Sequence, residues 1–444
     1  MNKVMIKPDL IFVESLISKS LPRFYRLVML ATVLVCFVQH GSANDWPQFR
    51  GPGGNASAEM TRTPIRWDDQ HNLAWKAKLP GRGASSPIIV GDRAYITAYS
   101  GYGIDPDDFG NKDDLRLHVI ALDKKSGTRI WEKTLVASVQ TQNCTRRVID
   151  HGYATSTPVS DGDAVFAYFG VSGLYAFSKE GKPIWHANTG EKTAGFGSAS
   201  SPVIHKNLVI VNASIESQNV VAFDKTSGKK VWEIPDVKRS WCTPCLARSR
   251  AGKTELIINQ IDTVRGFDPL SGRVLWTCQG IPDYTVPVPI SQDGVVYCLG
   301  GRSNRALAIQ LGGSGDVTRS HKLWDLPKGA NVTSPVYVDG RLYWASDKGI
   351  MNCIDAETGK EIYKSRLPTK KRIYGSIVRG GDHLYVTTRD QGVVVLSISH
   401  EYKVVSQNRF SADDSKLNAG PAVSEGSLYI RSDGFLYRIT ESNR

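Results

Sequence analysis

Short apolar runs recur along this chain, and each is followed by a polar turn and a second, alternating run. In "VVAFDKTSGKKVWEI" (220–234), an apolar strand ends at an Asp, a Ser-Gly turn follows, and a Trp lies on the next run. The same order recurs in "VIALDKKSGTRIWEK", in "VRGFDPLSGRVLWTC" and, with Tyr363 in place of Trp, in "MNCIDAETGKEIYKS". Runs of this length with period-two alternation and Gly-containing turns indicate antiparallel hairpins. The pattern therefore predicts one strand-turn-strand unit used many times.

A second signature alternates with the first: small residues, a Pro, an apolar stretch, a turn and an aromatic residue. Seven prolines and one isoleucine hold the anchor position: Pro87, Pro158, Pro202, Pro244, Pro289, Pro335, Ile377 and Pro421. Successive anchors lie 71, 44, 42, 45, 46, 42 and 44 residues apart. Periods in the low forties that hold about four short strands are typical of β-propellers. We predict an all-β, eight-bladed β-propeller of four-stranded antiparallel blades.

The two ends of the chain are predicted to close the ring together. After Pro421 two strands follow but no Trp turn, whereas "NLAWKAKLP" around Trp75 precedes the first anchor. We expect this N-terminal strand to complete the last blade. The repeated tryptophans are expected on the outermost strands, where a large ring fills the gap to the next blade. These residues are Trp75, Trp131, Trp185, Trp232, Trp276 and Trp324.

Residues 1–43 differ from the rest of the chain. Arg23 and Arg26 precede the apolar run 27–38, and Gly41 and Ala43 follow it, which is typical of a secretory signal. A retained membrane anchor or a lipid anchor at Cys36 are alternatives, but the run is short for a span. The prediction is a signal peptide over 1–43 and a single propeller domain over 44–444, without an integral membrane segment, in the periplasm or secreted.

Charge narrows the class of partner. The chain carries a net charge of +12, and loss of 1–43 would remove five cations and two acids and leave +9. A basic exported protein fits acidic partners or anionic ligands. No nucleic-acid motif is present, and export disfavours that use. We expect a monomer.

The residues just before each anchor are expected to converge on the central channel, because the anchor strand of a propeller blade is the innermost. Five residues before the anchors lie Arg82, Tyr153, Gly197, Arg239, Tyr284, Ala330, Arg372 and Lys416. Four of these are cations and none is acidic, and Trp241 and Tyr374, three residues before their anchors, add aromatic surface. Such a ring could hold an anionic small ligand or an acidic loop. Solvated loop ends of a basic protein are the alternative.

Two insertions lengthen the first repeat. "YGIDPDDFGNKDDL" joins the second and third strands of blade one, and "VASVQTQNCTRRVIDHGYATS" joins blade one to blade two. Both are expected on the face that carries the channel mouth. The acidic loop lacks the ordered spacing of a calcium loop. The second insertion contributes Arg146, Arg147, Asp150 and His151 as candidate partner-binding residues, and Asp150 with His151 is a further acid-base hypothesis.

The repeat A-x-D-x-x-[ST]-G-x-x-x-W resembles the quinoprotein-type repeat, found in eight-bladed pyrroloquinoline quinone (PQQ) dehydrogenases and in the outer-membrane assembly factor BamB. The resemblance covers residues 45–444. It implies either a non-enzymatic envelope scaffold that binds a protein partner or envelope component, or a PQQ- and calcium-dependent oxidoreductase. In the second case Arg82, Tyr153, Arg239, Trp241, Tyr284, Arg372 and Lys416 would hold the cofactor. A carbohydrate-binding propeller is a third interpretation, based on the mouth aromatics.

Cysteines separate these alternatives. The dehydrogenases of this family carry a disulfide between adjacent cysteines and a calcium ion held by Glu, Asn and Asp. No adjacent pair occurs here, and the nearest cysteines are Cys242 and Cys245. A bridge between these two, a pairing with Cys278, or buried free thiols all stay open at this stage. We favour the scaffold, with no cofactor expected and no catalytic residue or metal site assigned.

Overall fold

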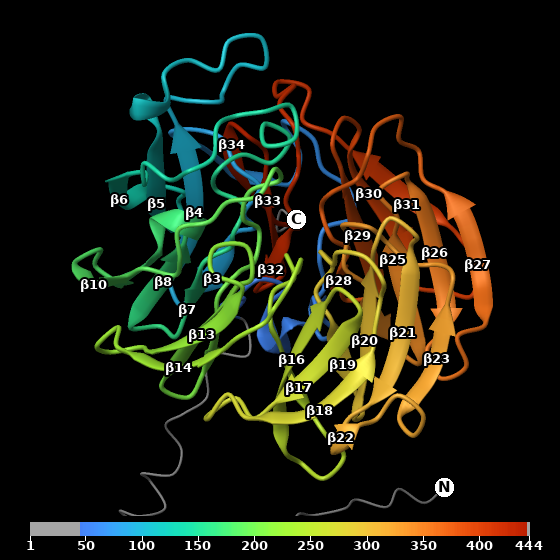
Figure 1. Cartoon of the computed structure of the whole chain (residues 1–444). Helices are drawn as coiled ribbons and strands as arrows, with labels where there is room; N and C mark the ends of the chain where they lie inside the picture. The colour runs from blue at the N-terminus through green and yellow to red at the C-terminus, as the bar shows by residue number, and fades with distance from the viewer. Residues whose placement is uncertain (1–44, 442–444) are drawn as a thin grey trace, which may run out of the picture. The chain divides into compact units, whose positions relative to one another are not determined.

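The computed structural model describes residues 45–441, so the expected signal segment lies outside the described part. Over these residues the strands form eight sheets, each with a core of four antiparallel strands. Figure 1 shows the sheets following one another round the ring in chain order, with the last blade beside the first. The prediction of an eight-bladed propeller is confirmed.

Within blades one to seven the four strands follow one another in chain order from the innermost to the outermost, and in blade eight the outermost strand is the N-terminal β2. Blade one contains β3 (Ile88–Val90), β4 (Arg93–Ser100), β5 (Arg116–Asp123) and β6 (Arg129–Val136), and blade two contains β7 (Val159–Ser160), β8 (Ala164–Tyr168), β9 (Leu174–Ser178) and β10 (Pro183–Ala187). Blade three contains β11 (Val203–His205), β12 (Leu208–Ala213), β13 (Asn219–Asp224) and β14 (Lys230–Ile234). Blade four contains β15 (Cys245–Arg248), β16 (Thr254–Gln260), β17 (Thr263–Phe267) and β18 (Val274–Gln279).

Blades five to eight are made of β19 (Ile290–Gln292), β20 (Val295–Gly300), β21 (Arg305–Gln310) and β23 (Lys322–Leu326); β24 (Val336–Val338), β25 (Arg341–Ala345), β26 (Ile350–Asp355) and β27 (Glu361–Arg366); β28 (Val378–Gly380), β29 (His383–Thr388), β30 (Gly392–Ser397) and β31 (Val404–Asn408); and β32 (Ala422–Ser424), β33 (Ser427–Arg431), β34 (Phe435–Ile439) and β2 (Leu73–Lys78). Two short strands extend sheets at their edges, β1 (Ser57–Ala58) on β28 and β22 (Gly315–Asp316) on β18. Three single-turn 3-10 helices are η1 (Pro52–Gly54), η2 (Lys112–Asp114) and η3 (Gly170–Ser172).

The ring closes as predicted. Strand β2, which carries Trp75, pairs antiparallel with β34 near the C-terminus and supplies the outer strand of blade eight. Closure joins the two ends of the domain through backbone hydrogen bonds, so that the last blade also has its full set of four strands.

The repeated turn has the same internal structure in several blades. Asp224 Oδ1 accepts hydrogen bonds from the amides of Thr226 and Ser227, and Gly228 adopts a φ of 70°. These backbone bonds lower the pKa of the Asp224 carboxyl. An Asp that caps its own turn and a glycine in the left-handed region are the features that the sequence predicts for this hairpin.

Every outer strand carries a β-bulge, which in seven of the eight blades comes immediately before the Trp or Tyr and in β31 comes before Ser406. In blade two, for example, the pairing skips from Pro183 to Trp185, and the displaced Ile184 is exposed. The same irregularity occurs in β2, β6, β14, β18, β23, β27 and β31. Bulges twist an edge strand and interrupt its free hydrogen-bonding row, which protects the rim of each blade from edge-to-edge pairing.

The N-terminal segment before β2 closes one end of the channel, an element that the sequence analysis did not predict. The backbone of Trp46 exchanges hydrogen bonds with Ile89 in blade one, and β1 lies parallel to β28 in blade seven. Between them, Arg50 is 3% exposed and donates to the carbonyl of Pro335 in blade six. Burial lowers the pKa of this guanidinium to about 9. The segment thus crosses the channel floor and contacts several inner strands.

Candidate functional site

The channel holds a cavity of about 400 Å³, and its wall follows a simple rule. The lining side chains come mainly from the positions one and three residues before each anchor, such as Ser201 and Ala199 before Pro202. Because side chains alternate along an extended backbone, every second residue faces the axis. The pre-anchor segments reach the channel, but of the eight residues five positions before the anchors only Tyr284 and Arg372 line the cavity.

Hydroxyl groups at the position before the anchor link one blade to the next. Ser201 Oγ accepts from the amide of Thr157 at 3.0 Å, and the amide of Ser201 donates to Thr243 Oγ1 at 2.9 Å. The same bond joins Ser86 to Thr157, Val288 to Ser334, and Ser334 to Ser376. The series is interrupted at blade five, where Val288 has no hydroxyl.

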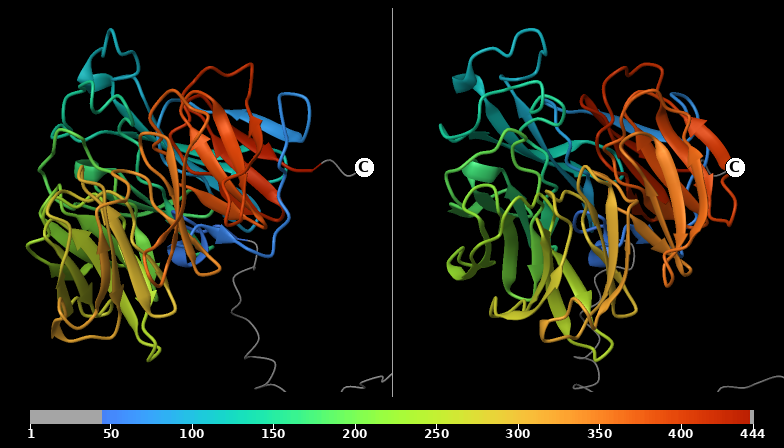
Figure 2. Two further views of the ribbon diagram at one scale, coloured as in Figure 1. Left: turned by 90° about the vertical axis from the view of Figure 1, so that its right-hand side faces the viewer. Right: turned by 45° about the vertical axis from the view of Figure 1, so that its right-hand side comes forward.

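Residues of the linker between blades one and two line the mouth of the channel, and the loop between β4 and β5 packs against this linker. Figure 2 shows the loop between β4 and β5 standing out beyond its blade. Its Tyr102 hydroxyl accepts from the amide of Cys144 at 2.9 Å, which ties it to the linker between blades one and two. That linker extends past blade one to the last two blades: Asp150 Oδ1 accepts from Arg389 in blade seven at 3.0 Å, and the Asp150 carbonyl accepts from Asn418, just before blade eight, at 2.8 Å.

Most of the predicted site residues meet at this cavity. Trp241, Tyr284, Arg372, Arg146, Arg147, Asp150 and His151 all line it. Lys416 lies close behind, with Nζ 4.0 Å from Asp150 Oδ1, and the Arg239 guanidinium lies 6.0 Å from the centre of the Tyr284 ring. The backbone of Arg82 pairs with Tyr99 next to the mouth, and its charge acts on Lys416.

Tyr153 takes a different direction. Its ring packs against Tyr99 and Tyr102, and its hydroxyl donates to the carbonyl of Gln142. The side chain braces the mouth loops and is not among the residues that line the cavity. In this Tyr153 resembles most residues five positions before an anchor, of which only Tyr284 and Arg372 line the cavity.

Asp150 and His151 have separate hydrogen-bond partners. Asp150 bonds to Arg389, whereas His151 Nδ1 lies 2.8 Å from Thr155 Oγ1. Burial lowers the pKa of His151, and the charge of Asp150 partly opposes this effect. The geometry supports a role for both residues in holding the linker, and no bond in the structure joins them as an acid-base pair.

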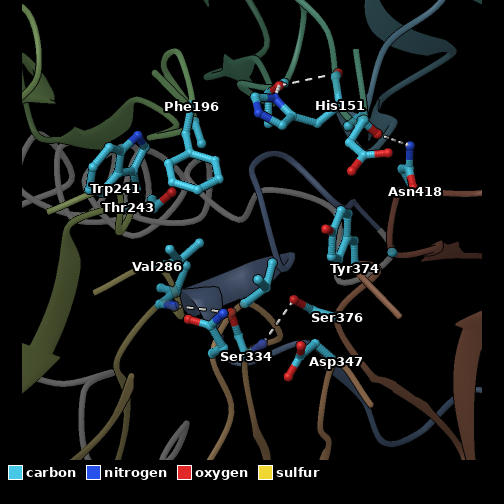
Figure 3. Close-up of a pocket in the computed structure, with 18 of the residues that line it drawn as sticks. His151, Phe196, Trp241, Thr243, Val286, Ser334, Asp347, Tyr374, Ser376 and Asn418 are labelled. Carbon is cyan, nitrogen blue, oxygen red and sulfur yellow. Dashed lines mark hydrogen bonds between the residues drawn. The ribbon is translucent and has the colours of Figure 1, made fainter. Parts of the chain in front are cut away.

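Three aromatic rings form one wall of the cavity, and Figure 3 shows two of them, Phe196 and Trp241, side by side. Phe196 lies 6.3 Å from both Trp241 and Tyr284, and Trp241 lies 5.7 Å from Tyr284, measured between ring centres. Trp241 Nε1 donates to the carbonyl of Gly197, which holds the indole in place. Phe196 was not predicted, because it lies in a loop outside the repeat.

Cations surround this wall. Arg147 lies over the Phe196 ring at 5.2 Å, and Arg389 lies over Tyr374 at 4.7 Å on the opposite side of the cavity. A hydrogen bond with Tyr374 raises the pKa of Arg372. Burial lowers the pKa of Lys416, with a further contribution from the charge of Arg389. The mouth is therefore an electropositive, partly apolar site.

The sequence analysis also missed polar residues of the wall. Asn331, Asn418 and Asp347 line the cavity, as does Phe49 from the floor segment. Asn418 follows the rule of the third position before an anchor, so extending that rule to all blades would have found it. Phe49 has no such signal, because the floor segment lies outside the repeat.

The side chains present do not fit a quinone-bound calcium ion. Between residues 45 and 441, no three His, Cys, Asp or Glu side chains come together as a metal site. Of the two carboxylates in the cavity wall, Asp150 is already bonded to Arg389. Cys242 and Cys245 are buried and free, and Cys242 Sγ contacts the carbonyl of Asn259. Cys278 is likewise a buried free thiol.

These features define an eight-bladed β-propeller whose central channel is closed at one end by the N-terminal segment and is lined by basic and aromatic side chains at the other. A family model described as outer membrane protein assembly factor BamB matches residues 113–240 and 260–401. The chain belongs to this family of BamB-like, PQQ-repeat β-propellers.

Known proteins with different roles share this fold. The outer membrane protein assembly factor BamB of Burkholderia pseudomallei is 25% identical over 82% of this chain and 86% of its own length. Tetrathionate hydrolase of Acidithiobacillus ferrooxidans is 21% identical over 74% of this chain and 68% of its own. The quinohemoprotein alcohol dehydrogenase of Comamonas testosteroni has a similar structure, with a TM-score of 0.61 and 12% identity over 93% of this chain and 82% of its own. The relatives include enzymes and a non-enzymatic factor. Within residues 45–441, no helix is long and apolar enough to cross a membrane.

Proposed function

We propose that this protein is an exported, non-enzymatic binding protein of the cell envelope, in the periplasm or secreted. A protein partner or another envelope component docks on the channel mouth. Membership of the BamB-like family supports this class of function. The domain works as a monomer in this proposal.

The observation that carries the proposal is the pairing of Phe196 with Arg147 at the mouth. Phe196 is 42% exposed although it belongs to an aromatic cluster, and the Arg147 guanidinium lies over its ring. Exposed aromatic and arginine side chains next to each other are typical of binding hot spots. Both residues lie in loops between blades, and the contacts of Phe196 with Trp241 and Tyr284 hold its loop in place, which lowers the conformational cost of binding.

Site-specific photocrosslinking in the native envelope tests the proposal. A photoreactive phenylalanine analogue replaces Phe196, and a control carries it at Leu270, which is 43% exposed in the β17–β18 turn on the opposite rim. We expect a discrete adduct from position 196, loss of that adduct in the Arg147→Glu background, and no adduct from position 270. No adduct at 196, or the same adducts at both positions, contradicts the proposal.

A PQQ-dependent oxidoreductase is the alternative. The cations and aromatics of the mouth would attract the carboxylates and ring of that cofactor, but the wall lacks a fitting calcium site. Titration with PQQ and calcium, followed by calorimetry and quinone absorbance, separates the two functions. Saturable binding that Arg372→Ala abolishes would overturn the binding-protein proposal. Absence of binding at high micromolar ligand agrees with it.

A further inference from the structure

The deeper cavity has features that the docking of a protein at the mouth does not use. Its wall offers side-chain hydroxyls from several blades, including Thr155, Ser334 and Ser376. Its volume of about 400 Å³ falls in the range of small-molecule sites. Phe49 and the floor segment close its lower end. The cavity is therefore a site for a compact polar molecule.

Two amide oxygens in this wall have no hydrogen-bond partner. Asn331 Oδ1 and Asn418 Oδ1 are both buried and unpaired. The amide nitrogen of Asn418 donates to the Asp150 carbonyl, which identifies the opposite atom as the free acceptor (Figure 3). Asn418 is 7% exposed, so bulk solvent reaches it poorly. Buried acceptors of this kind are normally paired. Both oxygens have almost no accessible surface in the empty cavity, so a ligand with hydroxyl donors pairs them once the two asparagine side chains turn toward it.

The aromatic wall supplies the complementary apolar contact. Figure 3 shows Trp241 and Phe196 on one side of the cavity, with Tyr374 and Asn418 across from them. The Trp241 ring is held by its bond to Gly197 and is positioned to contact a flat ligand face. A ring that presents an apolar face and an edge of hydroxyls satisfies both walls, which is the chemistry of a sugar.

The charges at the entrance specify an acidic sugar. Arg146 and Arg147 line the cavity, and neither forms an ion pair with a carboxylate in the described part of the chain. Arg372 also lines it, but this side chain is hydrogen-bonded to Tyr374 and interacts with the charge of Asp347 in the same wall. Asp150, the carboxylate nearest the linker, is bonded to Arg389. Free guanidinium groups bind carboxylates through paired, charge-assisted hydrogen bonds.

We infer that the channel cavity binds a short saccharide that carries a carboxylate, of the uronic acid type. The sugar ring stacks on Trp241, its hydroxyls donate to Asn331 and Asn418, and its carboxylate meets Arg147 at the entrance. A peptide suits the site less well, because a peptide offers one backbone donor per residue rather than a cluster of hydroxyls. The inference stands apart from the proposed function, since a protein can dock at the mouth whether or not the cavity is filled.

Calorimetry on the full domain tests this inference with digalacturonate and its dimethyl ester, which removes the charge and keeps the sugar. We expect digalacturonate to bind at least tenfold more tightly than the ester. Arg147→Met should weaken binding of the acid at least fivefold and leave the ester unchanged. Asn418→Ala and Trp241→Ala should weaken both ligands. Lys206→Met, which removes an exposed cation in the β11–β12 turn, is the matched control and should change neither.

Three results would overturn the inference. One is absence of binding at millimolar digalacturonate, with melting temperatures showing that the protein is folded. Another is equal affinity for two ligands that the inference separates. Equal affinity for the acid and its ester would mean that the site recognises only the hydroxyl groups, and equal affinity for citrate and digalacturonate would mean that it recognises only the negative charge. The third is tighter binding of hexaglutamate, which would assign the cavity to an acidic protein segment. The crosslinking from position 196 reports on the proposed function independently.

Discussion

The indole of Trp185 in blade two lies directly over Gly228 in the turn of blade three. A Cβ atom at position 228 would come within 2.6 Å of the Trp185 ring, and Trp185 Nε1 donates to the carbonyl of Lys225 in the same turn. Trp75 and Gly127 repeat this contact between blades eight and one, as do Trp131 and Gly181 between blades one and two. The Ser-Gly turn and the Trp of the repeat are thus two halves of one interface, contributed by neighbouring blades.

Gly228→Ala should therefore destabilise the domain more than a left-handed glycine alone would explain. We expect a loss of about 3 kcal/mol in unfolding free energy, from left-handed backbone strain together with overpacking against the indole. Gly340→Ala is the matched control, because Gly340 has a similar φ of 77° and a Cβ atom there would meet nothing within 4 Å. It should lose about 1 kcal/mol. Denaturant unfolding measures both free energies of unfolding. Equal losses in the two variants would show that the Trp185 indole moves aside without an energetic cost.

The hydroxyl series around the channel should contribute to stability. Thr243→Val keeps the side-chain shape and removes the acceptor for the amide of Ser201. Because Ser201 is 1% exposed, its amide would be left buried and unpaired, at a cost of about 2 kcal/mol.

The reverse change at blade five should stabilise the ring. Val288→Thr places a hydroxyl where the series is interrupted and offers an acceptor to the amide of Thr243. We expect a gain of about 1 kcal/mol. Calorimetric melting of the two single variants checks both signs. A stabilised Thr243→Val or a strongly destabilised Val288→Thr would mean that packing, not hydrogen bonding, determines these positions.

The ion pair of Asp150 with Arg389 should hold the linker across the mouth. Asp150→Ala removes the carboxylate partner of Arg389, and we expect local opening of the linker to become easier by about 1 kcal/mol. Hydrogen exchange of amides 143–152 measures this change. Asp163→Ala, at an exposed turn of blade two, should leave the exchange of these amides unaltered. Unchanged exchange in Asp150→Ala would show that the hydrogen bonds from Arg389 and Asn418 to the Asp150 carbonyl secure the linker without the carboxylate.

Glu216 should make the domain less stable as the pH rises. Burial raises the pKa of this carboxyl above its ordinary 4.5, although the Ser198 hydroxyl donates to it. Because the folded-state pKa exceeds that of the unfolded chain, the contribution of this group is fully present below pH 4.5. It is lost as the pH rises through the folded-state value.

Glu216→Gln keeps the shape and cannot ionise. Its melting temperature should therefore increase relative to that of the unaltered protein between pH 4 and pH 8. Glu357→Gln, at an exposed position in the β26–β27 turn, should show no such trend. A constant difference between Glu216→Gln and the unaltered protein across this range would contradict the burial of a titrating carboxyl.

The sequence by itself determined the blade count, the strand order, the ring closure through Trp75 and the capped Asp-Gly turns. Each of these features depends on contacts within one repeat or between neighbouring repeats, so it leaves a periodic pattern. It also indicated which pre-anchor segments reach the channel, because period-two alternation places every second residue on one side.

Only the tertiary structure decided what the channel contains. Most residues five positions before an anchor, Tyr153 among them, lie outside the cavity wall. The floor segment around Trp46 and Arg50, the exposed Phe196, and the pairing of Asp150 with Arg389, 239 residues away, lie outside the repeat. Such contacts join loops and chain ends that are distant in sequence, and their geometry depends on the closed ring that brings them together.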